Sequence, residues 1–147
     1  MKCVELNKKG QFELWNKTRL TELRQLQTCE DFSEYCLYQT KNVKMGLILL
    51  EPYERTPFRL IKNNFKLICL SGGDAITRFS HGGISLLMFE RGEYVSYNVH
   101  KKTMINDLQN IGKNLLVMAL IEYKGMFSKD GGFPSSLQVE IPIFSGY

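Results

Sequence analysis

The side chains in this sequence that could carry out chemistry are few and far apart. The chain holds two histidines, His81 in a Gly-rich turn and His100 just after a β-rich run. A catalytic metal needs a facial set of nitrogen and oxygen ligands that leaves positions open for substrate. Two isolated histidines do not supply such a set. We therefore interpret both as surface residues of turns.

Other reactive side chains lack a recognisable catalytic setting. Glu90 and Glu93 flank a turn, where two carboxylates are most simply solvated edge residues. No Gly-rich phosphate loop leads into a helix, and no nucleophile elbow surrounds the serines of the central part of the chain. Those serines are Ser71, Ser80, Ser85 and Ser96. The sequence therefore predicts a protein that is not an enzyme and has no cofactor.

The positions of the cysteines argue against two kinds of protein, those held by disulfides and those built around zinc. The cysteines form no C-x-x-C pair and none lies near a histidine at zinc-finger spacing, which argues against a disulfide framework and a zinc site. Free cysteines fit a reducing cytosol or nucleus. The four cysteines are Cys3, Cys29, Cys36 and Cys69.

Charge and hydropathy indicate neither a nucleic-acid site nor a membrane span. The net charge of +4 comes from scattered Lys and Arg, which permits a weak contact with DNA without indicating a dedicated site. The longest apolar runs, residues 45–50 and 115–121, are too short to cross a bilayer. We expect a soluble intracellular protein with no membrane partner.

One segment is expected to be a helix. Residues 16–27, NKTRLTELRQLQ, place a leucine at every third position against a polar background, which is one apolar stripe. Asn16 can cap the helix, and Trp15 can pack on Leu20 as a hydrophobic staple. We expect this helix to dock on the rest of the domain; the alternative is that it contributes to a partner surface.

After about residue 35 the pattern changes to short β-rich runs separated by Gly, Pro, Asn and Asp. A chain of 147 residues, 44% apolar and 23% charged, suits one globular domain. Many short strands at regular spacing favour an all-β sandwich or barrel. The expected strands are 35–40, 44–50, 65–70, 75–79, 83–89, 93–99, 103–105, 115–123 and 137–144.

The order of these strands and turns resembles that of a cupin, a jelly-roll barrel. An apolar strand ends in Glu51-Pro52, a strand reaches the turn Ser71-Gly72, a Gly-rich hairpin follows, and Arg91-Gly92, an Asn at 106 or 110 and an apolar strand close the pattern. The pairing of GLILLEP with NLLVMALIEYKG is most similar to the C-terminal cupin domain of centromere protein C, a kinetochore scaffold. The resemblance covers residues 45–125.

The resemblance implies an all-β fold, a cupin-type jelly-roll barrel with a short N-terminal helix and an extra C-terminal strand. The chain is then a single cupin-like domain, 1–147. Its core spans 41–125, with an N-terminal extension at 1–40 and a C-terminal extension at 126–147.

The resemblance also implies where a metal would sit. Metal-binding cupins supply a His-x-His pair, a Glu and a later His, and the corresponding positions of this chain lack a competent ligand set. His100 falls where relatives usually carry a turn Pro. The corresponding positions are Phe58-Arg59-Leu60, Asn63 or Asn64, and Met104. The expected barrel therefore has no bound metal.

The function implied by the resemblance is homodimerisation and protein docking in a centromere scaffold. The expected partners are a second copy and a centromeric histone assembly factor or other kinetochore protein, and the expected location is the nucleus, at the centromere and kinetochore. The alternative is a small-molecule-binding or metal-dependent cupin enzyme. Polar side chains facing an interior pocket would favour the alternative, and a barrel filled with Leu, Phe and Met would favour docking.

The candidate contact residues come from two strands and the C-terminal segment. Because side chains alternate along a strand, half of the strand residues must point into the core. Residues 137–144 alternate apolar and polar side chains, and Pro142 places them at an edge that pairs with the barrel or with a partner. The candidates are Leu86, Met88, Leu116, Met118, Phe133, Leu137, Val139, Ile141, Ile143 and Phe144.

Overall fold

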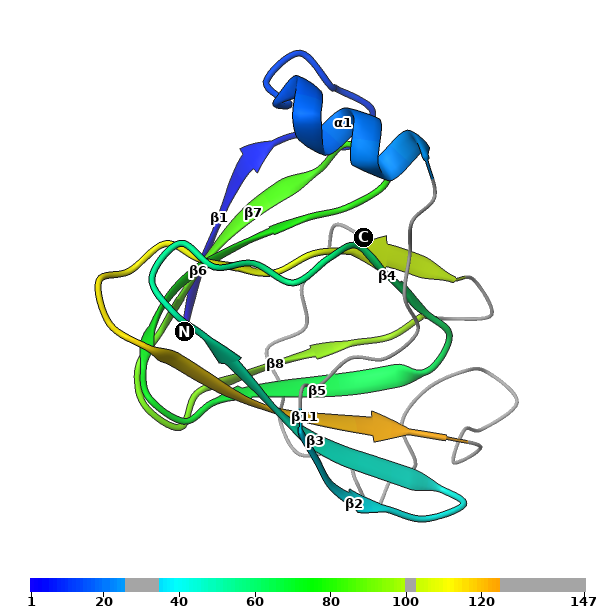
Figure 1. Cartoon of the computed structure of the whole chain (residues 1–147), viewed down its shortest axis with the longest axis vertical. Coiled ribbons are helices and arrows are strands. Elements are labelled where there is room, and N and C mark those ends of the chain that lie inside the picture. The colour runs from blue at the N-terminus through cyan, green and yellow to red at the C-terminus, as the bar shows by residue number, and fades with distance from the viewer. Residues whose placement is uncertain (26–34, 100–102, 125–147) are drawn as a thin grey trace.

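Two antiparallel sheets enclose one apolar core in the computed structural model (Figure 1), which describes residues 1–25, 35–99 and 103–124. The larger sheet has five strands in the order β2-β3-β11-β5-β8, and the smaller sheet has four in the order β1-β7-β6-β10. A separate pair joins β4 to β9. The strands are β1 (Lys2–Asn7), β2 (Tyr35–Gln39), β3 (Val43–Leu50), β4 (Arg59–Ile61), β5 (Asn64–Cys69), β6 (Gly73–Arg78), β7 (Ile84–Phe89), β8 (Tyr94–Tyr97), β9 (Met104–Asn106), β10 (Gln109–Asn110) and β11 (Leu116–Tyr123).

Most of the expected strands are confirmed. The runs that begin at 35, 44, 65, 75, 83, 93, 103 and 115 correspond to β2, β3, β5, β6, β7, β8, β9 and β11, and their ends differ by at most two residues. The expected strand 137–144 lies outside the described residues. Three strands were not predicted, namely β1, β4 and β10. The last two have three and two residues, too short to show a periodic pattern.

Strand β1 belongs to a barrel sheet although it lies in the segment expected to be an extension. It pairs with β7 from Lys2↔Met88 to Asn7↔Ile84. Its sequence, KCVELN, carries charges at its first and fourth positions, and its apolar and polar residues do not alternate. The pairing therefore depends on the partner strand β7, which the local pattern of β1 cannot reveal.

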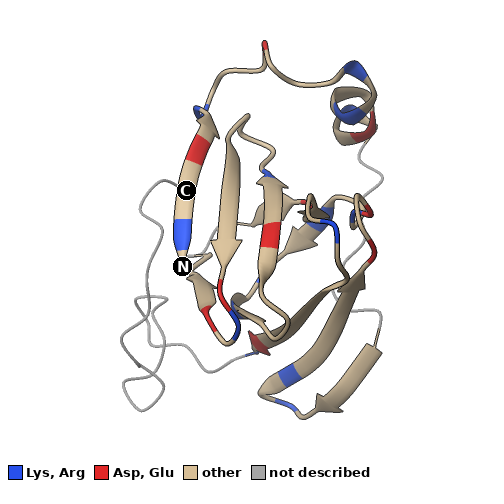
Figure 2. Cartoon of the chain, turned by 90° about the vertical axis from the view of Figure 1, so that its left-hand side faces the viewer, with Lys and Arg blue, Asp and Glu red and all other residues tan. Residues whose placement is uncertain are grey.

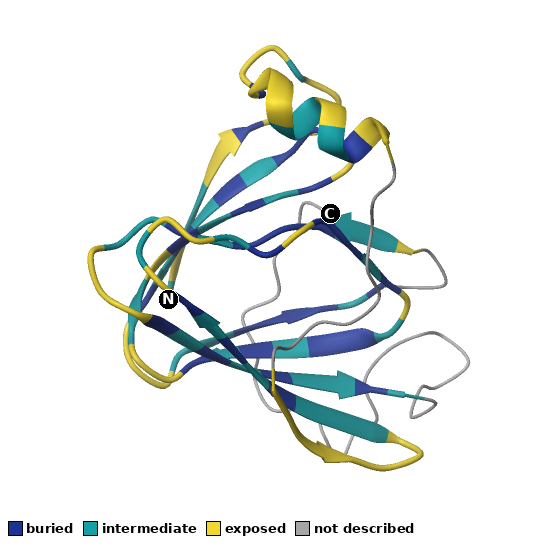
Figure 3. Ribbon diagram, in the orientation of Figure 1, coloured by how far each residue is buried: buried dark blue, intermediate teal, exposed yellow. Residues whose placement is uncertain are grey.

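Alternation along the central strands builds the core. β3 and β11 pair over their whole length, from Leu116↔Leu50 to Tyr123↔Val43. Their inward side chains are buried, and the smaller sheet supplies the opposite wall of the core through residues such as Leu87. Figure 3 shows buried residues, in dark blue, alternating with half-buried ones along strands of both sheets. This is the half-buried pattern of two sheets packed face to face.

Helix α1 (Lys17–Arg24) lies beyond one end of β1 and β7 (Figure 1). Asn16 caps it as expected, because its side-chain oxygen accepts a hydrogen bond of 2.7 Å from the Thr18 amide. The helix ends with Gln25 as its C-cap, and residues 26 and 27 lie outside the described part of the chain. Its length and polarity fit a docked surface helix. No helix in the described ranges is long and apolar enough to cross a membrane.

Trp15 anchors this helix. Its ring is 7% exposed and stacks on Phe58, with centroids 6.1 Å apart and an interplanar angle of 12°. Leu20 packs against the cluster that Trp15, Leu23 and Phe58 form, as the expected staple requires. The indole N–H donates a 2.8 Å hydrogen bond to the Gly82 carbonyl. The helix is therefore docked on the barrel.

Candidate interaction face and barrel interior

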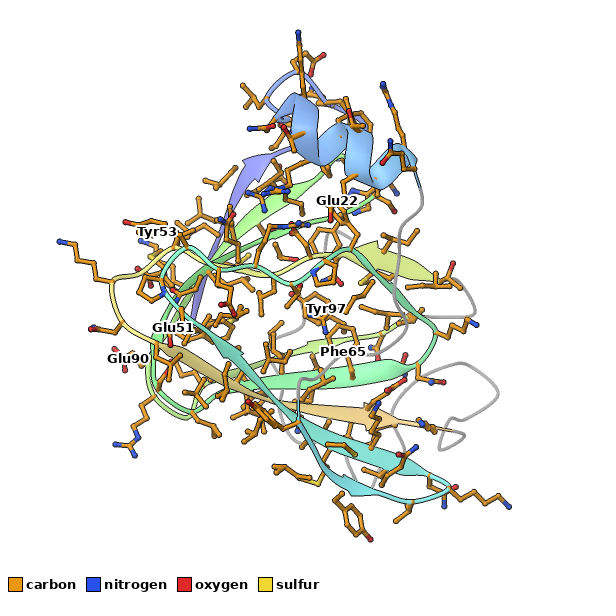
Figure 4. All side chains as sticks on the ribbon, in the orientation of Figure 1. Glu22, Glu51, Tyr53, Phe65, Glu90 and Tyr97 are labelled. Carbon is orange, nitrogen blue, oxygen red and sulfur yellow. The ribbon has the colours of Figure 1, made fainter. Side chains whose placement is uncertain are left out.

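The space between the sheets is filled with apolar side chains. Phe65 and Tyr97 stack at its centre with ring centroids 4.7 Å apart (Figure 4), and Phe79 lies 6.3 Å from Tyr97. Leu, Ile, Val and Met side chains of both sheets surround them. In small barrels such side chains fill the interior and leave little room for a ligand.

Some of the buried polar side chains bond to one another. Arg59 is 2% exposed and pairs across the β4-β9 ladder with Asn106. The Asn106 amide donates to the Thr77 hydroxyl at 3.2 Å, and that hydroxyl donates to the Asp107 carbonyl at 2.7 Å. These contacts join β4, β9 and β6, which is a structural role.

The positions that correspond to cupin metal ligands have other contacts. Phe58 is buried in the helix-docking cluster, and Met104 packs against the barrel core. Asn64 accepts a 2.8 Å hydrogen bond from the Val99 amide, and Asn63 donates one of 2.8 Å to Glu122. Within residues 1–25, 35–99 and 103–124, no group of three or more His, Cys, Asp and Glu could hold a metal. The residues present do not fit the metal of the metal-dependent cupins.

His81 lies in the turn between β6 and β7, as expected, but its side chain is half-buried rather than at the surface. The ring stacks on Phe79 with centroids 5.3 Å apart, and its Nδ1 accepts a 3.0 Å hydrogen bond from the Gly83 amide. Burial, and then the charge of Lys9, lower the pKa of His81 below its usual 6.5. The turn needs a neutral imidazole. His100 lies outside the described residues.

This geometry predicts a stability that depends on pH. Below pH 6.5 the unfolded chain takes up a proton at His81, whereas the folded chain does so only below its lowered pKa. The free energy of unfolding should therefore fall as pH decreases from neutrality through that window. Urea unfolding of the wild type and of His81→Gln, measured from pH 7.5 to 5, should give a shallower slope for the variant. Equal slopes would mean that His81 does not contribute. His100 is present in both proteins, so it cancels in the comparison.

The outer surface of the larger sheet is apolar. Side chains that alternate with the buried ones on β3 and β11 lie on this side in cross-strand pairs such as Leu47↔Ala119. Strands β5 and β2 continue it, because Ile68 pairs with Ala119 and Tyr35 pairs with Leu47. We call this surface the apolar face; it comprises Tyr35, Tyr38, Met45, Leu47, Leu49, Ile68, Val117, Ala119 and Ile121.

Exposure is greatest at the β2 border of the apolar face. Tyr35 and Tyr38 are 54% and 56% exposed, and the remaining members are half-buried among their neighbours. The opposite border of the apolar face carries a charge. Lys66 pairs there with Ile121, and its amine lies 4.8 Å above the Tyr94 ring. An apolar surface with a charged border is typical of a protein contact site.

The structure separates the candidate contact residues into two groups. Leu116 and Met118 are 1% and 0% exposed in the core, so they are the inward half of β11 and cannot contact another chain. Leu86 and Met88 lie on the outer side of the smaller sheet, half-buried between β1 and β6. The other candidates, Phe133, Leu137, Val139, Ile141, Ile143 and Phe144, lie outside the described residues.

Sequence reasoning missed most of the apolar face. The run MGLILL predicts a strand but does not show which of its side chains point outward. A strand that is apolar at every position is apolar on both surfaces, and this is the signal that could have located the face.

The chain matches no protein-family model and no curated protein. Solved structures are similar in fold. A cupin domain from Bordetella pertussis is 13% identical, covers 68% of this chain and 99% of its own, and has a TM-score of 0.56. An RmlC-like cupin family protein with a double-stranded β-helix fold from Methanocaldococcus jannaschii is 16% identical, with coverages of 67% and 92% and a TM-score of 0.50.

The cupin domain of Schizosaccharomyces pombe Cnp3 is one of several more distant matches, 12% identical, with coverages of 60% and 61% and a TM-score of 0.48. At these identities the likeness concerns the fold alone. The mostly β architecture with one short helix, predicted from the sequence, is confirmed: this chain has the double-stranded β-helix fold of the cupins.

Proposed function

We propose that this cupin domain is a non-enzymatic module for homodimerisation and protein docking, and that its contact surface is the apolar face with its edge strand β2. The observation that carries the proposal is the exposure of Tyr35 and Tyr38, 54% and 56%, beside the outward apolar side chains of β3 and β11. Tyrosine is enriched at protein contacts, since its ring buries a large area and its hydroxyl still reaches water.

The barrel interior supports this function over the enzymatic alternative. A ligand-binding cupin would need polar groups around an interior pocket. The described core instead holds mainly aromatic and aliphatic side chains. Among the buried polar residues, Thr77 and Asn106 bond to one another, and Asn64 and Asn110 bond to backbone groups. We propose that the chain has no cofactor and no catalytic role.

The centromeric part of the proposal comes from the sequence resemblance to the cupin domain of centromere protein C. A scaffold cupin at the kinetochore, in the nucleus, would join two copies of a long protein and receive a centromeric histone assembly factor or another kinetochore protein. The scattered basic residues add at most a weak contact with DNA.

The proposal predicts a dimer that depends on the apolar face. Light scattering of the wild type at micromolar concentration should give about twice the 17.0 kDa of one chain. Replacing both Tyr35 and Tyr38 by Lys should give a monomer, because charges enter a surface that must lose its water. The matched control changes Leu86 and Met88 to Lys on the smaller sheet and should stay dimeric.

A monomeric wild type would contradict the dimer, and loss of the dimer only in the control would place the contact on the smaller sheet. Circular dichroism of each variant verifies that the barrel is folded. The centromeric role can be tested by imaging the same three proteins in cells, each tagged with a fluorophore. The wild type and the control should concentrate at centromeres, and a diffuse wild type would contradict this role.

A further inference from the structure

Strand β2 is exposed along its whole length at one edge of the larger sheet. Among the described strands it pairs only with β3. All five of its residues, YCLYQ, are exposed (Figure 3), and Leu37 is 59% exposed. No other described strand pairs with the backbone groups on its outer side.

The other sheet edges are protected in ways that β2 is not. At the far edge of the larger sheet, β8 is mostly buried. In the smaller sheet, β1 carries Lys2 and Glu5 (Figure 2), and β10 has only two residues. Charged, short or covered edges are the usual means by which proteins prevent strand pairing. β2 has no charged residue and no proline, and the one irregularity that interrupts its edge is the register shift between Cys36 and Tyr38.

We propose that β2 of one subunit pairs antiparallel with β2 of a second copy, so that the two larger sheets become one continuous sheet. This inference rests on the proposed homodimer and assigns its contact. An antiparallel strand pair has a two-fold axis perpendicular to the sheet, which is the symmetry of the commonest dimers. The strand therefore fits a second copy of itself without any further element.

Full pairing of two copies of β2 places its middle residue, Leu37, at the centre of the contact. The register with β3 shifts between Cys36 and Tyr38, so Leu37 is an extra residue that does not oppose one on β3. A two-fold axis that passes beside Leu37 brings the two Leu37 side chains together. Since β2 is uncharged, the pairing opposes no like charges.

The pairing also doubles the apolar face. Tyr35 and Tyr38 lie on the outer side of the sheet, in line with Leu47 and Met45 of β3. The axis perpendicular to the sheet keeps both subunits' apolar faces on the same side. A partner protein would then meet one surface composed of both faces, centred on four tyrosine side chains, two from each subunit.

Cysteine cross-linking tests this geometry. In a chain whose Cys3, Cys29 and Cys36 are changed to Ser, Leu37→Cys should form a disulfide-linked dimer under mild oxidation with copper phenanthroline, because opposed Cβ atoms of paired strands are about 4.5–5.5 Å apart. The matched control is Leu14→Cys in the same background, since Leu14 is 72% exposed in the segment before α1. The control should cross-link at least about tenfold more slowly.

Charge substitution supplies a second measurement. Leu37→Lys should raise the dissociation constant of the dimer at least about tenfold, because two ammonium groups replace a buried leucine pair at the axis. Leu14→Lys should leave it unchanged. If the wild type is a dimer but Leu37→Lys dissociates like the wild type and Leu37→Cys links no faster than Leu14→Cys, the β2 pairing is wrong and the dimer uses another surface. A monomeric wild type would overturn both the dimer and this assignment.

Discussion

Changing Asp107 to Asn should destabilise the fold by about 3–5 kcal/mol, the usual cost of removing one partner from a buried ion pair. Asp107 is 0% exposed, and its Oδ2 accepts hydrogen bonds of 2.9 Å from Arg55 Nε and from Arg78. Its Oδ1 accepts another, of 2.9 Å, from the Arg78 amide. The Arg side chains are 12% and 15% exposed, so the variant leaves two nearly buried cations close together.

The partly exposed pair between Arg19 and Glu22 provides the control. Arg19 is 30% exposed and lies 3.1 Å from Glu22, which keeps Arg55 as a second partner, so removing the Arg19 charge should cost only about 0–1 kcal/mol. Urea unfolding of the wild type, Asp107→Asn and Arg19→Gln, followed by tryptophan fluorescence, gives the two differences. A loss below about 1 kcal/mol for Asp107→Asn would show that Glu22, which also binds Arg55 at 2.8 Å, is sufficient to compensate the arginines.

Changing Trp15 to Ala should also cost about 3–5 kcal/mol, because a large buried ring is removed and its stacking on Phe58 is lost. The effect should be greatest at helix α1. Amide hydrogen exchange should accelerate more in Lys17–Arg24 than in β11, since the helix loses its anchor while the barrel core keeps its contacts.

Trp15→Phe distinguishes the contribution of aromatic packing to stability from that of the indole hydrogen bond. Phe keeps an aromatic surface on Phe58 but cannot donate to the Gly82 carbonyl. That carbonyl still accepts a 2.7 Å hydrogen bond from the Asn7 side chain, so the variant should cost about 0.5–1.5 kcal/mol, the usual net contribution of one hydrogen bond. Because Trp15 is the single tryptophan, unfolding of both variants has to be followed by far-ultraviolet circular dichroism. Equal exchange rates in α1 for the wild type and Trp15→Ala would contradict an anchoring role.

The turns made the strands predictable. Gly72 and Gly92 adopt φ angles of +73° and +86°, which glycine reaches without strain, and they separate β5 from β6 and β7 from β8. Local residue types therefore carried enough information to divide the chain into its main strands. They carried less about β1, whose partner β7 lies about eighty residues away in sequence.

The buried ion pairs around Asp107 could not be predicted from the sequence. Asp107 contacts Arg55 and Arg78, which lie 52 and 29 residues away in the sequence. No local sequence pattern predicts contacts over such separations. The outward orientation of Leu47 could not be predicted either, for a different reason. Core-facing and partner-facing positions of β3 use the same apolar residue types, so only the register between strands distinguishes them.

Strand β1 also has a consequence for solubility. It covers the edge of β7, whose sequence ISLLMF is apolar, uncharged and free of proline and glycine, the composition of segments that assemble into amyloid-like stacks. Lys2 and Glu5 of β1 replace that edge with one whose charges discourage further stacking. The first seven residues thus protect the domain against aggregation, held in place by the backbone ladder to β7 and by Met1 and Cys3, which pack against the core.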